Sequence, residues 1–211
     1  MSDRVFRFAI GGVDLWLEAS KSTGIGGHLW ASAMITTGAL LRSRASFEGK
    51  RVLELGSGTG ALGIALATLG AHVTLTDTAS HLPLLQRNVE LNAARIAERR
   101  GSVTVRELDW DLDTPSELVG AFDLVVASDV VTLIFGFEGI QKQLINLCTP
   151  STEVWLGYEQ RGEEKAFWRA IRRHFRLRKL CESELHAEQL PQLPHLNAVL
   201  RLHKREHPVE L

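Results

Sequence analysis

The sequence has little of several things that mark particular classes of protein. It holds two cysteines among 211 residues, Cys148 and Cys181, and both fall in apolar helix and strand patterns, so a disulfide framework is not expected. The eight histidines are scattered singly, without the H-E-x-x-H or Cys/His spacing of a metal site. The longest apolar stretch, residues 122–137, is broken by four polar residues and is too short to cross a bilayer. We therefore expect neither a metal centre nor a membrane span.

An excess of charge of one sign is also missing. The 24 Lys and Arg residues nearly balance the 25 Asp and Glu residues, and the formal net charge is −1. Such a chain has no global attraction for nucleic acid or for an anionic membrane, so either partner would need a local patch. The first residues do not form the charged, apolar and small-residue series of a secretory leader, which favours a reduced cytoplasmic protein, with a nuclear location also compatible.

What the sequence does contain is a glycine-rich strand–turn–helix. Apolar residues 52–55 run into a loop of alternate glycines, and a helical pattern covers residues 61–67. Glycine allows a tight turn and a close approach of the backbone to a ligand. The N–H groups of the first helical turn point to the same place, so this stretch predicts a ligand-binding loop. The loop consists of Gly56, Ser57, Gly58, Thr59 and Gly60.

The loop by itself leaves two cofactor classes open. With Ala61 it also fits the G-x-G-x-x-G/A fingerprint of dinucleotide-binding proteins, and Asp77 lies near the distance at which that fingerprint places a ribose-binding acid. Three features favour a different cofactor. They are Glu54 two residues before the loop, the glycine at position 60, and the pair Asp109-Trp110 at the end of a later strand.

Taken together, E-x-G-x-G-x-G, Thr76-Asp77 and Asp109-Trp110 resemble the seven-strand methyltransferases that use S-adenosyl-L-methionine. The resemblance implies that Asp77 accepts hydrogen bonds from both ribose hydroxyls. It further implies that Asp109 accepts one from the adenine amino group and that Trp110 contacts the purine. Glu54 would receive the methionine ammonium through water or hold the turn. The alternatives are a helix cap for Asp77 and a core aromatic for Trp110.

The rest of the chain alternates strand and helix patterns, which predicts the α/β class. The expected fold is a Rossmann-like, seven-stranded, mostly parallel sheet with helices on both faces, an antiparallel last strand and an accessory N-terminal β-hairpin around Gly11-Gly12. Residues 1–211 are treated as a single methyltransferase domain, with the accessory hairpin and helix in 1–45 and the seven-strand core in 46–205. The expected core strands cover residues 52–55, 72–77, 103–108, 122–131, 153–159, 177–185 and 198–203.

Two further segments resemble one particular branch of the seven-strand methyltransferases. Thr23-Gly24 is followed by Leu29-Trp30 and an alanine-bearing helix, and the fifth strand ends in Tyr158-Glu159-Gln160-Arg161. These segments resemble one branch of the class, the family-16 methyltransferases, which include non-SET protein-lysine methyltransferases. The resemblance implies that Trp30 packs near the cofactor and that the end of the fifth strand lines the acceptor pocket. A position in the core is the alternative for Trp30.

The fourth strand ends in Ala127-Ser128-Asp129, next to the point where the strand order of such a sheet reverses. We expect Ala127 and Ser128 to contact the cofactor and Asp129 to face its methyl group. Methyl transfer needs a neutral amine aligned with the S–CH3 bond, and lysine is largely protonated, with an ordinary pKa of about 10.4. Asp129 could orient the amine or take its proton, and Glu159 is a second candidate contact to the substrate cation. The alternative role is a cap of the following turn for Asp129 and an acid on the surface at the strand end for Glu159.

One position departs from the family-16 branch. The family pattern D-x-x-Y begins at Asp129, but its fourth residue is Thr132. Threonine cannot supply the aromatic wall of a tyrosine. Either another ring supplies it, with Phe135, Phe137 and Tyr158 as candidates, or the acceptor differs.

The resemblance to this branch makes a protein lysine side chain the expected acceptor. The N/D-P-P-Y/F signature of nucleobase methylases is missing after the fourth strand, and the basic run in residues 169–179 is more typical of a solvated face than of a nucleic-acid site. A protein histidine, a small-molecule amine and a non-catalytic cofactor-binding role remain open, and a nicotinamide-dependent oxidoreductase is a more distant alternative. We expect a monomer that acts on an unidentified protein substrate.

Overall fold

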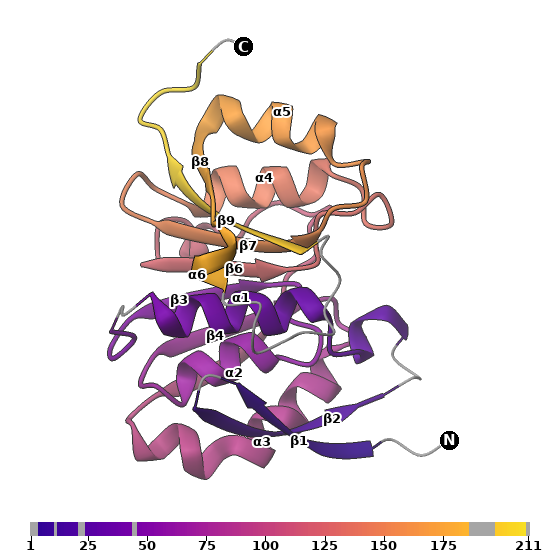
Figure 1. The fold of residues 1–211 in the computed structure, drawn as a ribbon, viewed down its shortest axis with the longest axis vertical. Coiled ribbons are helices and arrows are strands. Elements are labelled where there is room, and N and C mark those ends of the chain that lie inside the picture. Colours follow the sequence, from indigo (N-terminus) through magenta and orange to yellow (C-terminus); the bar gives the residue numbers. More distant parts are fainter. Residues whose placement is uncertain (1–3, 11, 21–23, 44–45, 186–196, 210–211) are drawn as a thin grey trace.

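The computed structural model describes residues 4–10, 12–20, 24–43, 46–185 and 197–209, which form two sheets and the helices around them (Figure 1). Gly11 of the predicted hairpin turn and Thr23 lie outside the described residues. In chain order the elements are β1 (Arg4–Ile10), β2 (Val13–Ala19), η1 (Gly24–Gly27), α1 (Ala31–Arg42), β3 (Arg51–Leu55), α2 (Ala61–Ala67), β4 (His72–Asp77), α3 (Leu82–Glu98), β5 (Ser102–Glu107), η2 (Ser116–Leu118), β6 (Leu124–Ser128), α4 (Glu138–Leu147), β7 (Glu153–Glu159), α5 (Lys165–His174), β8 (Phe175–Lys179), α6 (Glu182–Leu185) and β9 (Asn197–Lys204).

The large sheet has the strand order β5-β4-β3-β6-β7-β9-β8. β3 pairs in parallel with β4 and β6, and β6 pairs in parallel with β7. β9 runs antiparallel to both β7 and β8, which confirms the predicted seven-stranded sheet with an antiparallel last strand. The order reverses between β3 and β6. Ligands of such sheets bind beyond the carboxyl ends of the strands at this point.

β6 shows why the sheet needs helices on both faces. Leu124 and Val126 are buried in a core shared with α1, α2 and the hairpin, whereas Val125 and Ala127 are buried in a second core shared with α4 and α5. Successive side chains of a strand point to opposite faces, so an unbroken apolar strand requires a layer on each side. In Figure 1, α4 and α5 cover one face of the sheet, and α1, α2 and α3 lie on the other.

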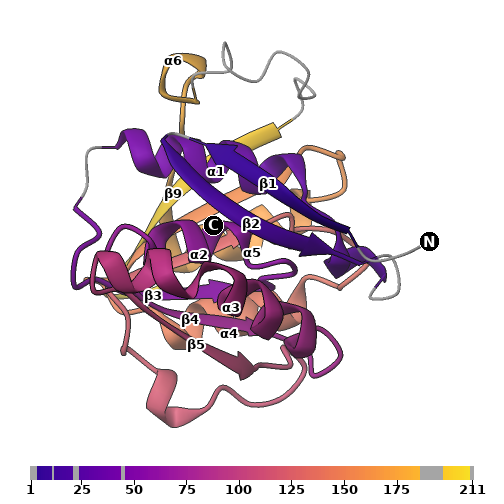
Figure 2. The same cartoon turned by 90° about the horizontal axis from the view of Figure 1, so that it is seen from below.

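The hairpin of β1 and β2 packs against α2 and α3 (Figure 2). Two asparagines of α3 hydrogen-bond to the backbone of β2 as a neighbouring strand would. Asn92 accepts the N–H of Trp16 at 3.0 Å and donates to its carbonyl at 2.7 Å. Asn88 makes the same pair of bonds with Glu18, at 2.6 and 3.0 Å. Asn88 also donates to the carbonyl of Thr59 at 2.9 Å, so one side chain joins the hairpin to the glycine loop.

Two predicted strands end earlier than expected. The strand predicted over residues 177–185 is β8, which stops at Lys179 and is followed by α6. The carboxylate of Glu184 accepts the N–H of Cys181 at 2.9 Å, and this cap favours a helical turn over a continued strand. The strand predicted over residues 122–131 is limited to β6, because the chain turns at Asp129 with a φ of +58°.

Candidate active site

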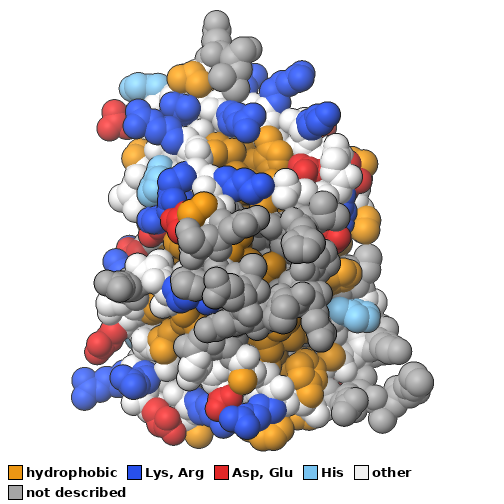
Figure 3. Space-filling model, in the orientation of Figure 1, with side chains coloured by type: hydrophobic (Ala, Val, Ile, Leu, Met, Phe, Trp, Pro, Cys, Tyr) orange, Lys and Arg blue, Asp and Glu red, His pale blue; other side chains and the backbone are white. Residues whose placement is uncertain are grey.

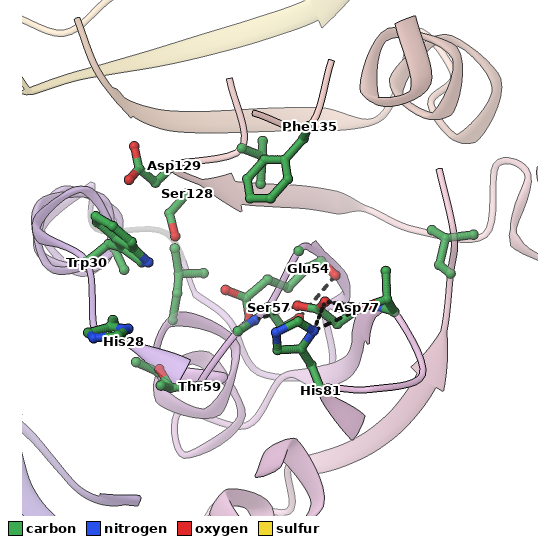
Figure 4. A pocket seen from close by; sticks show the side chains of 18 of the residues that line it. His28, Trp30, Glu54, Ser57, Thr59, Asp77, His81, Ser128, Asp129 and Phe135 are labelled. Atoms are coloured by element: carbon green, nitrogen blue, oxygen red, sulfur yellow. Dashed lines mark hydrogen bonds and ion pairs between the residues drawn. The ribbon is translucent and has the colours of Figure 1, made fainter. Parts of the chain in front are cut away.

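A cavity of about 520 Å³ opens beyond the carboxyl ends of β3, β4, β5 and β6, where the strand order predicts a ligand (Figure 4). Its volume is typical of ligand sites in proteins, which span about 300–1,000 Å³. The lining combines the glycine loop, several carboxylates and aromatic side chains. It includes His28, Trp30, Glu54, Gly56, Ser57, Gly58, Thr59, Asp77, His81, Asp109, Trp110, Ser128, Asp129 and Phe135.

Gly56 allows the loop to adopt a left-handed turn and lets two side chains pack closely against its backbone. Its φ is +63°, and a Cβ atom there would lie 2.9 Å from Val130 and 3.0 Å from Trp110. Ser57 ties the loop to β4. Its N–H donates to the carbonyl of Thr76 at 2.9 Å, and its hydroxyl accepts the N–H of Thr76 at 3.0 Å. The loop backbone is therefore fixed at the cavity, where a ligand can approach it closely.

Asp77, at the end of β4, presents a carboxylate to the cavity. One oxygen accepts the N–H of Gly58 at 2.8 Å, and the other accepts the N–H of Thr78 at 2.8 Å. The Nδ1 atom of His81 lies 3.1 Å from the same carboxylate, and Figure 4 shows the two side chains together at the cavity wall. A carboxylate held in this way can still accept hydrogen bonds from a vicinal diol, as predicted for the ribose.

Glu54 is buried beneath the loop, with only 1% of its surface exposed. Its Oε2 atom accepts the N–H of Gly63, in the first turn of α2, at 3.0 Å. Burial raises the pKa of Glu54 to about 8; the Gly63 N–H opposes this rise, and the nearby Asp77 carboxylate adds to it. Glu54 therefore holds the turn, which is one of its two predicted roles. It also lines the cavity, where a cationic group could reach it.

We expect the stability difference between the parent and Glu54→Gln to depend on pH. The folded protein keeps a proton on Glu54 that the unfolded chain releases above the ordinary pKa of 4.5, so the stabilisation is present at low pH and is lost as the pH rises through about 8. Within that window the parent should lose about 1.4 kcal/mol per pH unit relative to the variant. Urea unfolding of both proteins across the window measures this slope, and a constant difference would contradict the raised pKa.

Trp110 and Phe135 form an aromatic part of the cavity wall. Their rings meet edge to face with centroids 5.9 Å apart, a favourable arrangement for aromatic pairs. Asp109 lines the cavity beside Trp110 and accepts the N–H of Asp111 at 2.9 Å. An aromatic surface next to a carboxylate suits a purine with an exocyclic amino group, in keeping with the roles predicted for Asp109 and Trp110.

Trp30 stands at the cavity just before α1, near His28 (Figure 4). It is 37% exposed, and its ring centroid lies 6.2 Å from that of His28. This exposure excludes the alternative of a tryptophan closed within the core. Trp30 is therefore available to a ligand.

Asp129 follows β6 with a φ of +58°, a conformation that costs a residue with a Cβ atom about 1–2 kcal/mol. Its N–H donates to the carbonyl of Gly157 at 2.8 Å. The guanidinium of Arg161 donates to both carboxylate oxygens of Asp129, each at 3.0 Å, and to the carboxylate of Glu159 at 2.9 Å. Only 7% of the Asp129 side chain is exposed. Backbone strain of this kind is characteristic of functional sites.

Thr132 stands where the family pattern has tyrosine, and it is 4% exposed. Its hydroxyl donates to the carboxylate of Glu163 at 3.2 Å. Thr132 therefore does not supply the aromatic wall that a tyrosine would form at this position. Of the three rings considered as a replacement, Phe135 lines the cavity. Phe137 and Tyr158 pack in the core with α5 instead.

Gly60, Ala127 and Glu159 are the predicted site residues that the cavity lining does not include. Gly60 turns the loop into α2 with a φ of +77°. Ala127 points into the core beneath α4 and α5 because strand side chains alternate between faces. The carboxylate of Glu159 is held by Arg161 beside the cavity.

Sequence reasoning missed three features of the site. His28 and His81 line the cavity, and Arg161 is the partner of Asp129. His81 carried a local signal, since it lies four residues after Asp77 in the turn that leads into α3. Arg161 belonged to the family-like end of the fifth strand, but nothing in the sequence related it to a residue 32 positions earlier.

In the described part of the chain, no three His, Cys, Asp or Glu side chains gather as a metal ion would require. Of the two cysteines, Cys148 is buried and Cys181 is exposed. None of the helices among the described residues is long and apolar enough to cross a membrane.

The sequence profile of a family described as Lysine methyltransferase matches residues 11–174, more than half of the chain. The chain belongs to the lysine methyltransferase family. This membership confirms the family resemblance carried by the glycine loop, by Asp77 and by Asp109-Trp110. The match also covers the accessory helix α1, the turn after β6 that holds Asp129, and β7, which ends in Glu159.

Curated relatives are similar over most of their length. Protein N-lysine methyltransferase METTL21A of Danio rerio is 33% identical over 161 residues, which cover 76% of this chain and 73% of that protein. EEF1A lysine methyltransferase 3 of Xenopus tropicalis is 34% identical over 140 residues, covering 66% of this chain and 60% of that protein. Protein-lysine N-methyltransferase EFM6 of Saccharomyces cerevisiae is 28% identical over 212 residues, covering 87% and 84%.

Solved structures share the fold. The 16S rRNA N2 G1207 methyltransferase RsmC of T. thermophilus, in complex with AdoMet and guanosine, has a TM-score of 0.70 at 20% identity and covers 96% of this chain and 51% of that chain. The ribosomal protein L11 methylase of Lactobacillus delbrueckii subsp. bulgaricus has a TM-score of 0.54 at 18% identity, covering 83% and 77%. At these identities the likeness shows the fold alone.

The cavity of this family member fits S-adenosyl-L-methionine. Gly56 leaves open a space that a Cβ atom would fill, and Asp77 offers acceptors for a ribose diol. The carboxyl group of Glu54 can accept from an ammonium group, whose positive charge would favour its ionised form. Trp110 supplies an aromatic surface for the purine. Family and fold together make the chain an S-adenosylmethionine-dependent methyltransferase.

Proposed function

We propose that this enzyme methylates the side-chain amine of a lysine in a protein substrate and that Asp129 contacts the acceptor. The observation that carries the proposal is the place of Asp129. Its carboxylate lies in the lining of the same cavity as the cofactor residues and is shielded from water over most of its surface. The names of the relatives, protein N-lysine methyltransferase and EEF1A lysine methyltransferase 3, support lysine as the acceptor.

Residues in or just after three strands, β3, β4 and β5, would hold the cofactor. Asp77 would accept from the ribose, Asp109 and Trp110 would contact the adenine, and Glu54 would face the ammonium of the amino-acid end. S-Adenosylmethionine supplies, when bound, a sulfonium whose methyl group an amine lone pair can attack, with the C–S bond electrons leaving on sulfur.

Asp129 would orient the acceptor amine. A carboxylate oxygen that accepts an N–H of the amine turns the nitrogen lone pair away from Asp129 and into the cavity. Alignment of this kind is the main contribution that an enzyme can make to a direct displacement. Trp30 and Phe135, which are 37% and 44% exposed as residues, line the cavity, and an entering lysine side chain would be flanked by them.

We further propose that the basic run of residues 169–179 is a solvated face. Arg169, Arg172 and Arg173 are exposed on α5, and Figure 3 shows Lys and Arg side chains gathered at the end of the molecule where α5 lies. Arg178 pairs with Glu184. None of these arginines lines the cavity, so they take no part in the site.

Incubation of the purified protein with radiolabelled S-adenosylmethionine and whole-cell extract tests the proposed function. We expect a discrete labelled protein band that S-adenosylhomocysteine suppresses. Acid hydrolysis of the band should release labelled methyl-lysine, whereas labelled methyl-histidine would replace lysine by histidine as the acceptor. Label in small molecules alone would refute a protein substrate. Tight cofactor binding without any label would favour a non-catalytic binding protein.

A further inference from the structure

Arg161 is surrounded by carboxylates next to the proposed acceptor site. Its Nη1 and Nη2 atoms donate to the two oxygens of Asp129, each at 3.0 Å, and Nη2 also donates to Glu159 at 2.9 Å. The Arg161 side chain is 27% exposed and that of Asp129 is 7% exposed. A bidentate pair with so little exposure is both strong and fixed in geometry.

A second contact joins the same two segments. The carboxylate of Glu163, two residues after Arg161, accepts the hydroxyl of Thr132 at 3.2 Å and the N–H of Leu133 at 2.9 Å. The segment after β7 thus donates to the segment after β6 through Arg161 and accepts from it through Glu163. These contacts hold the backbone that carries Arg161 next to the segment that carries Asp129, so the pair is a built part of the site.

Asp129 alone would oppose the reaction in one respect. A carboxylate close to an amine favours the ammonium form and raises the pKa of the amine by about 1–3 units. Only the neutral amine carries the lone pair that attacks the methyl group. Because lysine starts from a pKa of about 10.4, an unopposed carboxylate would leave very little neutral amine at neutral pH.

We propose that Arg161 is a positioning residue that fixes the Asp129 carboxylate and offsets its charge, so that the acceptor lysine reacts as a neutral amine. This inference rests on the proposed function of the site. Each carboxylate oxygen has two lone pairs, and Arg161 uses one on each. The N–H of Glu159 approaches Oδ1 at 3.5 Å, so a lone pair of Oδ2 is left for the acceptor. The guanidinium stays charged at every working pH, so the offset does not titrate.

The lysine ammonium first releases one proton to water. The amine nitrogen then bonds to the methyl carbon as the C–S bond breaks, and the electron pair of that bond stays on sulfur. The product is a methylated ammonium, which loses a proton to water before any further transfer. Arg161 acts on the first proton equilibrium and takes part in no bond change.

Other titratable groups near this pair are common to the parent and to any Arg161 variant. Glu159 and Glu163 face Arg161 from β7 and from the segment before α5. His28, Asp77 and His81 belong to the lining of the same cavity. Because these groups contribute alike to the parent and to the Arg161 variants, a difference between the pH profiles of these proteins reports the cation at position 161.

The inference is tested by single-turnover methylation of the acceptor protein that the labelling experiment identifies. The enzyme is in excess over this acceptor, and S-adenosylmethionine is saturating. At saturating enzyme the rate constant reports the bound complex, and its dependence on enzyme concentration reports acceptor binding. For Arg161→Gln we expect the acid limb of the pH profile to move up by at least about 1 pH unit, which is about tenfold in rate at neutral pH. The rate should recover in alkali, and acceptor binding should be no weaker than in the parent.

Two further variants sharpen the test. Arg161→Lys keeps a cation and should keep the acid limb of the parent. Glu159→Gln removes a carboxylate from the cluster and should move the limb the opposite way, which gives a readout even if Arg161→Gln does not fold. Binding of S-adenosylhomocysteine, measured by calorimetry, shows which variants are folded.

Equal acid limbs in the parent and in Arg161→Gln, or a loss that is uniform over pH, would overturn the inference, since a merely structural role predicts a uniform loss. Asp129→Asn in the same series separates this result from the proposed function. Lost turnover in Asp129→Asn with an unshifted Arg161→Gln profile removes only the role of Arg161. Full turnover in Asp129→Asn, or a parent enzyme that labels no protein, overturns both.

Discussion

Replacing Asp129 by asparagine should slow methyl transfer at least about 100-fold while the binding of S-adenosylhomocysteine stays unchanged. A carboxamide carries no charge and presents an N–H2 group in place of one acceptor oxygen, so it cannot hold an amine as a carboxylate does. The cofactor groups, from Glu54 to Trp110, are untouched by the change. Initial rates with radiolabelled cofactor and a calorimetric titration of the same preparations measure the two effects.

Asparagine is the matched replacement because of the backbone at this position. The φ of Asp129 is +58°, and asparagine tolerates this left-handed conformation better than most residues do. Asp129→Ala removes the same charge but adds backbone strain, so urea unfolding of the two variants separates strain from chemistry. If Asp129→Asn methylates as well as the parent, Asp129 does not belong to the acceptor site.

Gly157→Ala should destabilise the protein by roughly 3 kcal/mol and lower the midpoint of thermal unfolding by about 10 °C. A Cβ atom there would lie 1.8 Å from the Oγ1 atom of Thr36 and 3.0 Å from the carbonyl of Ser32, both in α1. β7 is held between β6 and β9, so α1 must move instead of the strand. Because the Gly157 carbonyl accepts the N–H of Asp129 at 2.8 Å, activity should fall as well.

Thr36→Ala is the control for this variant. It removes the Oγ1 atom that a Cβ at position 157 would strike, while the contact with the Ser32 carbonyl remains. The double variant should therefore recover most, though not all, of the stability lost in Gly157→Ala, a coupling typical of residues in direct contact. Strictly additive losses would show that Thr36 is not the obstacle.

Short local patterns made much of the site predictable. The glycine loop lies between β3 and α2, Asp77 is the last residue of β4, and Trp110 follows β5, so a strand pattern predicted the place of each of them. The antiparallel β9 followed from two adjacent strand patterns at the end of the chain, where a plain dinucleotide fold would continue with a helix. The fold was predictable for the same reason, since each element carried its own periodicity.

Contacts between distant segments were not predictable in this way. Arg161 meets Asp129 across 32 positions, and its direction depends on the turn after β7, which no periodicity specifies. The apolar pattern of the sequence continues through Val130 and Val131. β6 nevertheless ends before them, because the chain makes a left-handed turn at Asp129. The Glu184 cap likewise ends a strand pattern through one local hydrogen bond.

The double attachment of Asn88 bears on how far the chain can be shortened from its N-terminal side. The fully buried carboxamide donates to the carbonyl of Glu18 in the hairpin and to the carbonyl of Thr59 in the glycine loop. Trimming the chain back to the start of the large sheet would remove one of these two partners and expose Asn88 to water. We therefore expect a fragment without β1 and β2 to bind the cofactor more weakly than the whole chain does, although no described residue of either strand belongs to the cavity lining.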